Sequence, residues 1–183
     1  TLILEAHENF QKQSLRNRCY LLLPNKTECL TIPIEKGSKR NPIKEVKIDH
    51  SDHWINQHLQ TIRTGYGRSA FFEHYFPFVE FILQKKHTHL WDLNLDLLLF
   101  LKKNLAPTLK IEETSDFNLD YELPIQDFRN TLKRDVVPVN LTLKPYYQNF
   151  GSNFVPNLSS LDLLFNMGPA SSGHLQTKTL PRN

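Results

Sequence analysis

Several features that mark particular protein classes are scarce or absent in this chain of 183 residues. Its two cysteines, Cys19 and Cys29, cannot form the disulfide framework of a small secreted protein, so we expect a reducing, cytoplasmic location. No apolar run approaches the ~20 residues of a membrane-spanning helix, and no membrane span is expected. Met167 is the only methionine, from which we expect that the sequence begins inside a longer protein and lacks a preceding strand.

The short motifs of common catalytic sites are also missing. The sequence has no Gly-x-Ser-x-Gly elbow, no Walker loop and no Gly-x-Gly-x-x-Gly turn. The histidines at positions 50, 53, 87 and 89 do not have the spacing of zinc ligands, and neither cysteine has a metal-type partner nearby. We therefore expect no metal site, and the sequence leaves open whether the protein uses a cofactor.

The overall composition is that of a globular domain with a mildly basic charge. Hydrophobic residues make up 39% and charged residues 22% of the chain, and the net charge is +3. Nucleic-acid binding usually needs a contiguous stripe of lysine and arginine, which this sequence lacks. A small anionic or sugar-derived ligand is the better expectation, and nucleic acid is not expected. The composition does not decide between a monomer and a homo-oligomer.

The periodicity of apolar residues predicts an α/β fold in a single domain, with a central sheet flanked by helices. We expect this domain to cover residues 2–168 and a mobile tail to cover 169–183, which are rich in Ser, Thr, Gly and Pro. An α+β fold with an antiparallel meander over residues 19–48 is the alternative. Strands are predicted at 2–6, 19–23, 29–34, 46–48, 109–112 and 136–143. A helical region is predicted at 54–84, interrupted at Gly65 and Gly67, where Pro77 either breaks the second part or begins a new helix, and further helices are predicted at 90–103 and 159–167.

The last predicted helix has explicit start and stop signals. Ser159 fits the N-cap, Asp162 fits the reciprocal position of a capping box, and Gly168 with Pro169 fits the end of the helix. Capping therefore competes with ligand contact as the role of Ser159 and Asp162. Three nearby polar residues are not explained by capping and are better candidates for a binding site: Tyr147, Gln148 and Asn166.

A basic loop between the first two predicted strands is a second candidate. It contains Lys12, Arg16, Asn17 and Arg18, and guanidinium and ammonium groups of this kind bind phosphate or carboxylate. The alternative is a solvated loop whose charge is neutralised by nearby acidic residues, Glu5 and Glu8.

Two further pairs are candidates. Trp54 and His58 lie four residues apart, so they share one stripe of a helix that flanks its buried face. Such a stripe lines a cleft or holds a half-buried aromatic beside a surface histidine. If it lines a cleft, His58 suits a general acid or base. Asp127 and Arg129 lie in a long charged loop, where they form either a lid over an anionic substrate or a surface ion pair.

Taken together, these segments resemble the WbqC-like protein family. The resemblance is carried by residues 5–14 with Arg16-Asn17-Arg18, by Leu30-Thr31-Ile32-Pro33, Trp54 to His58, Tyr66, Phe71-Phe72, Leu90-Trp91-Asp92-Leu93-Asn94, Asp127 to Arg129, and residues 146–150 and 154–169. It implies a cytoplasmic bacterial protein of surface-polysaccharide biosynthesis that modifies an amino or nucleotide-linked sugar by acyl or aminoacyl transfer. The alternative is a non-catalytic ligand-binding or scaffold protein of a polysaccharide assembly system.

We also predict that candidates far apart in sequence meet in space. The three segments are the basic loop 12–18, the Trp54/His58 stripe and residues 147–166. At least two of them are expected to line one pocket near the missing strand that we expect to precede residue 1, because nothing in a soluble fold otherwise requires them to converge.

Overall fold

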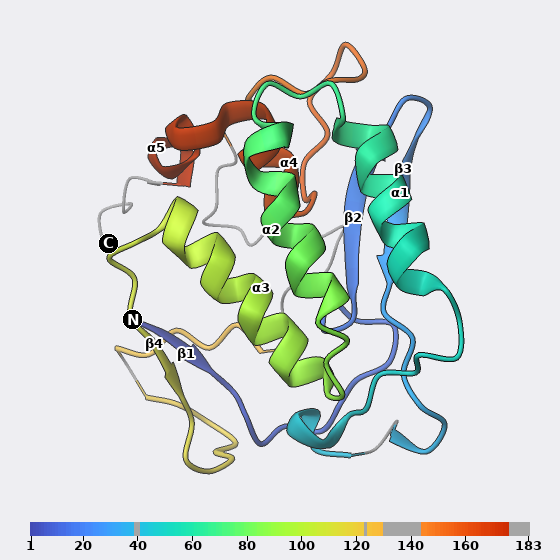
Figure 1. Cartoon of the computed structure of the whole chain (residues 1–183). Coiled ribbons are helices and arrows are strands. Elements are labelled where there is room, and N and C mark those ends of the chain that lie inside the picture. The colour runs from blue at the N-terminus through green and yellow to red at the C-terminus, as the bar shows by residue number, and fades with distance from the viewer. Residues whose placement is uncertain (39–40, 123, 130–143, 176–183) are drawn as a thin grey trace.

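The computed structural model describes residues 1–38, 41–122, 124–129 and 144–175. The predicted strand over 136–143 lies outside these residues. Within them, helices and strands are mixed in one body, which confirms the α/β class (Figure 1).

The strands are divided between two small sheets. β2 (Arg18–Leu23) and β3 (Lys26–Thr31) form an antiparallel hairpin that pairs Leu23 with Lys26, as the short gap between them predicts. β1 (Leu2–Leu4) pairs in parallel with β4 (Ile111–Glu113), more than a hundred residues away in the chain. The segment 46–48 contributes isolated bridges, Lys47 to His89 and Ile48 to Ile34, in place of a further strand.

Three long helices make up the middle of the chain: α1 (Trp54–Tyr66), α2 (Phe72–Gln84) and α3 (Leu90–Leu105). Their apolar residues recur with helical spacing and are buried on the inner face. Figure 1 shows the three helices side by side, with the β2–β3 hairpin against α1. α2 continues through Pro77, where a break was predicted. Pro77 is exposed, and the buried residues around it hold the helix in place despite one lost hydrogen bond.

The C-terminal helices cover one end of this layer. α4 (Ser160–Met167) contacts α2 and α3, and the ring of Phe165 lies 5.3 Å from that of Tyr66 between centroids. The Ser159 hydroxyl accepts from the Leu161 amide, which confirms Ser159 as the N-cap. Gly168 ends the helix with φ +54°, and a Cβ there would lie 2.4 Å from the Phe71 ring. Both observations require glycine at this position.

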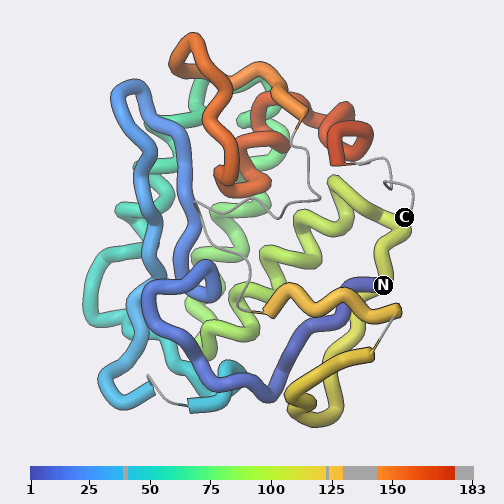
Figure 2. The backbone as a smooth tube through the Cα atoms, turned by 180° about the vertical axis from the view of Figure 1, so that it is seen from behind, coloured from blue at the N-terminus to red at the C-terminus, as the bar shows by residue number. Residues whose placement is uncertain are grey.

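The chain does not leave the fold at Pro169. A short 3-10 helix, η3 (Gly168–Ala170), and α5 (Ser171–Leu175) follow, and Ser171 is fully buried. The tail expected from residue 169 onward is thus helical as far as 175, and residues 176–183 lie outside the described part. From behind, Figure 2 shows β1, β4 and residues 124–129 gathered beside α3, on the side away from the hairpin's tip.

Candidate functional site

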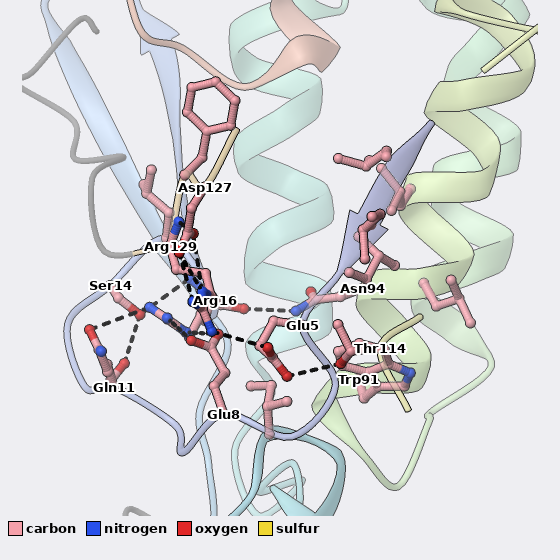
Figure 3. Close-up of a pocket in the computed structure, with 18 of the residues that line it drawn as sticks. Glu5, Glu8, Gln11, Ser14, Arg16, Trp91, Asn94, Thr114, Asp127 and Arg129 are labelled. Atoms are coloured by element: carbon pink, nitrogen blue, oxygen red, sulfur yellow. Dashed lines mark hydrogen bonds and ion pairs between the residues drawn. The ribbon is translucent and has the colours of Figure 1, made fainter. Parts of the chain in front are cut away.

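A cleft of about 1160 Å³ opens between the N-terminal strand, the loop that follows it, α3 and residues 124–129 (Figure 3). Charged and aromatic side chains face each other across it. Among the described residues, its polar lining is Glu5, Glu8, Gln11, Lys12, Gln13, Ser14, Arg16, Asn94, Thr114, Gln126, Asp127 and Arg129. Its apolar lining includes Leu4, Leu15, Tyr20, Ile43, Trp91, Leu95, Leu98, Tyr121 and Phe128.

Arg16 and Glu8 form a two-pronged ion pair in the cleft. Arg16 Nε donates to Glu8 Oε1 over 2.6 Å, and Nη2 donates to Oε2 over 2.5 Å. The backbone carbonyl of Arg16 accepts from the Asn94 side chain of α3 over 2.8 Å, which ties the loop to the helix. The loop turns tightly at Gln13, which has φ +55°. The Ser14 hydroxyl donates a hydrogen bond to the Gln11 carbonyl and closes this turn. The pair is therefore held rigidly, and its charges cancel.

Glu5 connects the N-terminal segment to the chain after β4. Oε1 accepts from the His7 amide and the Thr114 hydroxyl, each over 2.9 Å. Oε2 accepts from the Tyr121 hydroxyl over 3.3 Å and from Arg129 over 3.2 Å. The side chain is only 7% exposed, so this carboxylate is largely withdrawn from solvent and saturated with donors.

Arg129 has partners for all five of its N–H groups. Nε and Nη2 donate to the Asp127 carboxylate, Nη1 to Glu5 and the Asn118 carbonyl, and Nη2 also to the Leu119 carbonyl. Hydrogen bonds from Arg129 hold the pKa of Asp127 below its usual range. Because this guanidinium is fully engaged, it fastens residues 118–129 to the N-terminal segment.

Four predicted site residues thus line the cleft: Lys12, Arg16, Asp127 and Arg129. The Trp54/His58 stripe and residues 147–166 do not line it. Only one of the three segments expected to converge does so here, in a cleft that lies beside β1. The reason is that α1 turns its Trp54/His58 stripe toward the hairpin, while residues 146–166 pack over the ends of α1 and α2.

His58 is a buried residue of α1 that faces the hairpin. Its ring lies 5.1 Å from that of Trp54, in an edge-on arrangement, and both side chains are buried. Burial lowers the pKa of His58 from 6.5 to about 4, against a smaller opposing effect of the Thr31 backbone. His58 is therefore neutral near pH 7, and the pair has the environment of a packed core contact.

Asp162 is the centre of a second polar cluster, which we call the Asp162 hub: Asp162, Tyr66, Tyr146 and Gln148. The carboxylate accepts from Tyr66 over 2.9 Å, from Tyr146 over 2.6 Å and from the Gln148 amide over 3.0 Å. Asp162 is completely buried. The capping-box interpretation of its carboxylate is wrong, because its oxygens point to α1 and residues 146–148, away from the helix start. Burial raises the pKa of both tyrosines.

The remaining predicted residues lie around these two clusters. Asn166 donates to the Asp162 carbonyl over 2.9 Å within α4, and Tyr147 is 70% exposed. Asn17 is buried at the start of β2 and donates to the Ile32 carbonyl over 2.9 Å. Arg18 begins β2, and its Nε is buried without a hydrogen-bond partner among the described residues. None of these side chains lines the cleft.

Sequence reasoning did not single out Glu5, Glu8, Trp91 and Thr114 as site residues. The two glutamates were read as neutralising the basic loop, which is what Glu8 does to Arg16. Trp91 lies in the first turn of α3, with the Lys44 ammonium 5.2 Å from its ring. Nothing in its sequence neighbourhood distinguishes a cleft-lining tryptophan from a core one, because the partner walls come from residues 1–16 and 114–129.

The described part of the chain offers no metal centre. No group of three or more His, Cys, Asp or Glu side chains among these residues is arranged to hold a metal ion. Burial raises the pKa of the Cys19 thiol to about 12, as expected for an inert buried cysteine. No helix there is long and apolar enough to cross a membrane.

Comparison with known proteins identifies the family. Residues 1–127 match the WbqC-like protein family. The chain belongs to this family. The matched region contains β1, the loop with Glu8 and Arg16, α3 and the wall up to Asp127, and it stops before Arg129 and the Asp162 hub. This WbqC-like chain is also 24% identical to the uncharacterised protein Rv1507c of Mycobacterium tuberculosis, over 91% of the chain and 84% of that protein. No solved structure matches it significantly.

Proposed function

We propose that this WbqC-like protein binds a sugar-derived ligand in the cleft and modifies an amino or nucleotide-linked sugar by acyl or aminoacyl transfer, in the cytoplasm, during surface-polysaccharide biosynthesis. The observation that carries the proposal is the mixed lining of the cleft. Planar carboxylate, amide and guanidinium groups line it together with the Trp91 ring. Such groups hydrogen-bond sugar hydroxyls, while an aromatic face packs on the apolar face of a pyranose ring.

The volume of the cleft supports a ligand larger than a monosaccharide. Clefts that hold drug-sized ligands measure ~300–1,000 Å³, and this one measures about 1160 Å³. A sugar and an acyl donor fit this space side by side. The charged groups lie toward Arg16 and Glu5, and the apolar groups of α3 offer a separate surface for the donor.

The transfer itself requires a proton acceptor. The sugar amine forms a bond to the carbonyl carbon of an activated acyl donor. The bond between that carbon and the leaving group breaks, and the leaving group keeps the electron pair. The amine nitrogen then loses a proton. His58 is buried against the hairpin, so a carboxylate of the cleft is the better acceptor. Glu8 is the candidate, because each of its oxygens has one hydrogen bond from Arg16 and retains a second lone pair.

Non-catalytic ligand binding is the second candidate, and one observation favours it. No histidine or cysteine is found among the described residues that line the cleft, and its carboxylates are all hydrogen-bonded to arginine. For Asp127, the hydrogen bonds from Arg129 lower the pKa, which makes this carboxylate a weaker base. Under this alternative the same residues hold a sugar ligand without turning it over.

The test combines binding and turnover with the full chain. Calorimetry against amino sugars, nucleotide-linked sugars and acyl donors should give saturable binding. Trp91→Ala should lower the affinity for the sugar by about tenfold, because this change removes the stacking surface. Phe81→Ala, an exposed aromatic on α2 outside the cleft, is the matched control. If no sugar derivative binds, or if both variants behave alike, the sugar-binding proposal is wrong.

Mass spectrometry of mixtures of amino sugar and acyl donor separates the two candidates. Acylated product that is lost in Glu8→Gln, with sugar affinity largely retained, supports the transferase. Sugar binding without any product for the whole donor panel supports the binding protein and contradicts catalysis.

A further inference from the structure

We infer that the cleft selects an amino sugar with a free, protonated amine, and that it does not bind the diphosphate of a nucleotide-linked sugar. This inference rests on the proposed sugar-binding function and narrows its substrate class. Three features carry it: the engagement of both cleft arginines, the spare acceptor capacity of Glu8, and the charge of the wall after β4.

The first feature is that neither arginine of the cleft is available as a phosphate fork. All five N–H groups of Arg129 are used by Asp127, Glu5 and two backbone carbonyls. Arg16 places Nε and Nη2 on Glu8 and Nη1 near the Gln11 amide oxygen. Bidentate arginine is the usual partner of a phosphate, and a diphosphate here would have to displace a carboxylate that is already paired with the arginine.

The second feature is that Glu8 presents acceptors to a ligand. Its side chain is 14% exposed and is fixed by the two hydrogen bonds from Arg16. Each oxygen keeps one lone pair for a donor, and hydroxyl and ammonium groups are donors whereas a phosphate is not. A carboxylate that is already oriented loses little entropy when the ligand binds.

The third feature is the negative charge of the wall formed by residues 111–129. This segment contains six acidic residues and a single basic one, Arg129. Where it meets the cleft, Glu5 and Asp127 share that one arginine, so the three-residue cluster keeps one net negative charge. Such a field attracts an ammonium group and repels a diphosphate. Lys12 is exposed and is the lining cation that remains outside these pairs.

The experiment compares ligands that differ only in charge. Methyl glycosides of amino hexoses, their N-acetyl and hydroxyl counterparts, and uridine diphosphate are titrated into the full chain near neutral pH. At least one amino hexoside should bind about tenfold more tightly than its N-acetyl and hydroxyl counterparts, since one charge–carboxylate interaction has that magnitude. Uridine diphosphate should not compete.

Variants then assign the selectivity to the cleft. Glu8→Gln should remove the preference for the amine, and Glu73→Gln, at an exposed position of α2 outside both the cleft lining and the wall 111–129, should leave it unchanged. If Glu8→Gln lowers the melting temperature, the comparison is repeated with Asp127→Asn, a more exposed carboxylate of the cleft, and with Asp52→Asn, an exposed residue outside the cleft and the wall, as its control. If Glu8→Gln and Asp127→Asn both keep the preference for the amino hexoside, the inference is wrong.

Failure of the inference and failure of the proposed function look different. Equal binding of the N-acetyl sugar, or competition by uridine diphosphate, overturns the selectivity and leaves a sugar-binding cleft in place. Absence of binding by every sugar derivative overturns both.

Discussion

The Asp162 hub and the cleft use the same chemical group in two different ways. Asp162 is completely buried and accepts only from neutral donors, two tyrosine hydroxyls and one amide. Glu8 and Asp127 lie at a surface, 14% and 34% exposed, and each is paired with an arginine. The hub joins α4 to α1 and to residues 146–148, whereas the cleft carboxylates face an open volume.

The difference shows which of the two can bind a ligand. A carboxylate that accepts three hydrogen bonds in the interior and that no solvent reaches can only hold the fold together. A carboxylate that is fixed by an arginine and still touches solvent can accept from a ligand without rearrangement. Solvent exposure, and not residue type, separates the structural aspartate from the candidate site.

The largest effect is expected from Asp162→Ala. Removing the carboxylate leaves Tyr66, Tyr146 and Gln148 with donors in the interior that have lost their acceptor. The free energy of unfolding should fall by about 3–5 kcal/mol in urea titrations. Asp116→Ala, at an exposed position, should change it by no more than about 0.5 kcal/mol. Similar losses in the two variants would contradict the structural role of the hub.

The next effect is a pH dependence of stability that comes from His58. Its pKa in the folded state is about 4, below the ordinary 6.5, so the unfolded chain binds a proton more readily between these values. Stability is therefore fully present above pH 6.5 and is lost as the pH falls toward 4, by up to about 3 kcal/mol. His58→Gln should flatten this part of the profile of unfolding free energy against pH. An unchanged slope would show that His58 is not buried as described.

Gly168→Ala tests the end of the helix that carries Asp162. The new Cβ would lie 2.4 Å from the Phe71 ring, in a backbone conformation that favours glycine. We expect a loss of about 2–3 kcal/mol in thermal or urea unfolding. Gly173→Ala is the matched control, because a Cβ there meets nothing within 4 Å. Equal stability of the two variants would contradict the described packing of Gly168 against the Phe71 ring.

The smallest effect on stability is expected in the cleft, from Glu5→Gln. This change keeps the size of the side chain but removes the charge that faces Arg129, and the loss should be about 1–2 kcal/mol. The amide of Ala6, which donates to Thr114, should exchange its hydrogen faster than in the Glu112→Gln control. Unchanged exchange at Ala6 would mean that Glu5 does not fasten the wall to the N-terminal segment.

Much of the fold could be predicted because its signals are local. The helical spacing of apolar residues placed α1 and α3 within a few residues of their observed ends, and the Ser159 cap and Gly168 were both identified from neighbouring residues. The short gap between Leu23 and Lys26 predicted the hairpin. Pro77 was misjudged, because packing on both sides of it outweighs the local preference to break the helix.

The candidate site was predicted in part, because the chemistry of its residues can be recognised locally in the sequence. Lys12, Arg16, Asp127 and Arg129 were chosen for their chemistry, and they do line one cleft. The stripe of Trp54 and His58 was on the correct helix face, but the sequence carries no signal for what that face meets. Its partner is the hairpin end at Thr31, which belongs to another element.

The sequence alone determined the class of fold, the limits of α1, α3 and α4, and the family, because each depends on residues that are close together in the chain or on short sequence motifs. Only the tertiary structure decided which polar groups hydrogen-bond within the fold and which face a cavity. The pairing of Glu5 with Arg129 spans 124 positions, and that of Tyr66 with Asp162 spans 96. Such pairings depend on how β1, α1 and α4 pack, and solvent access follows from that packing and not from residue type.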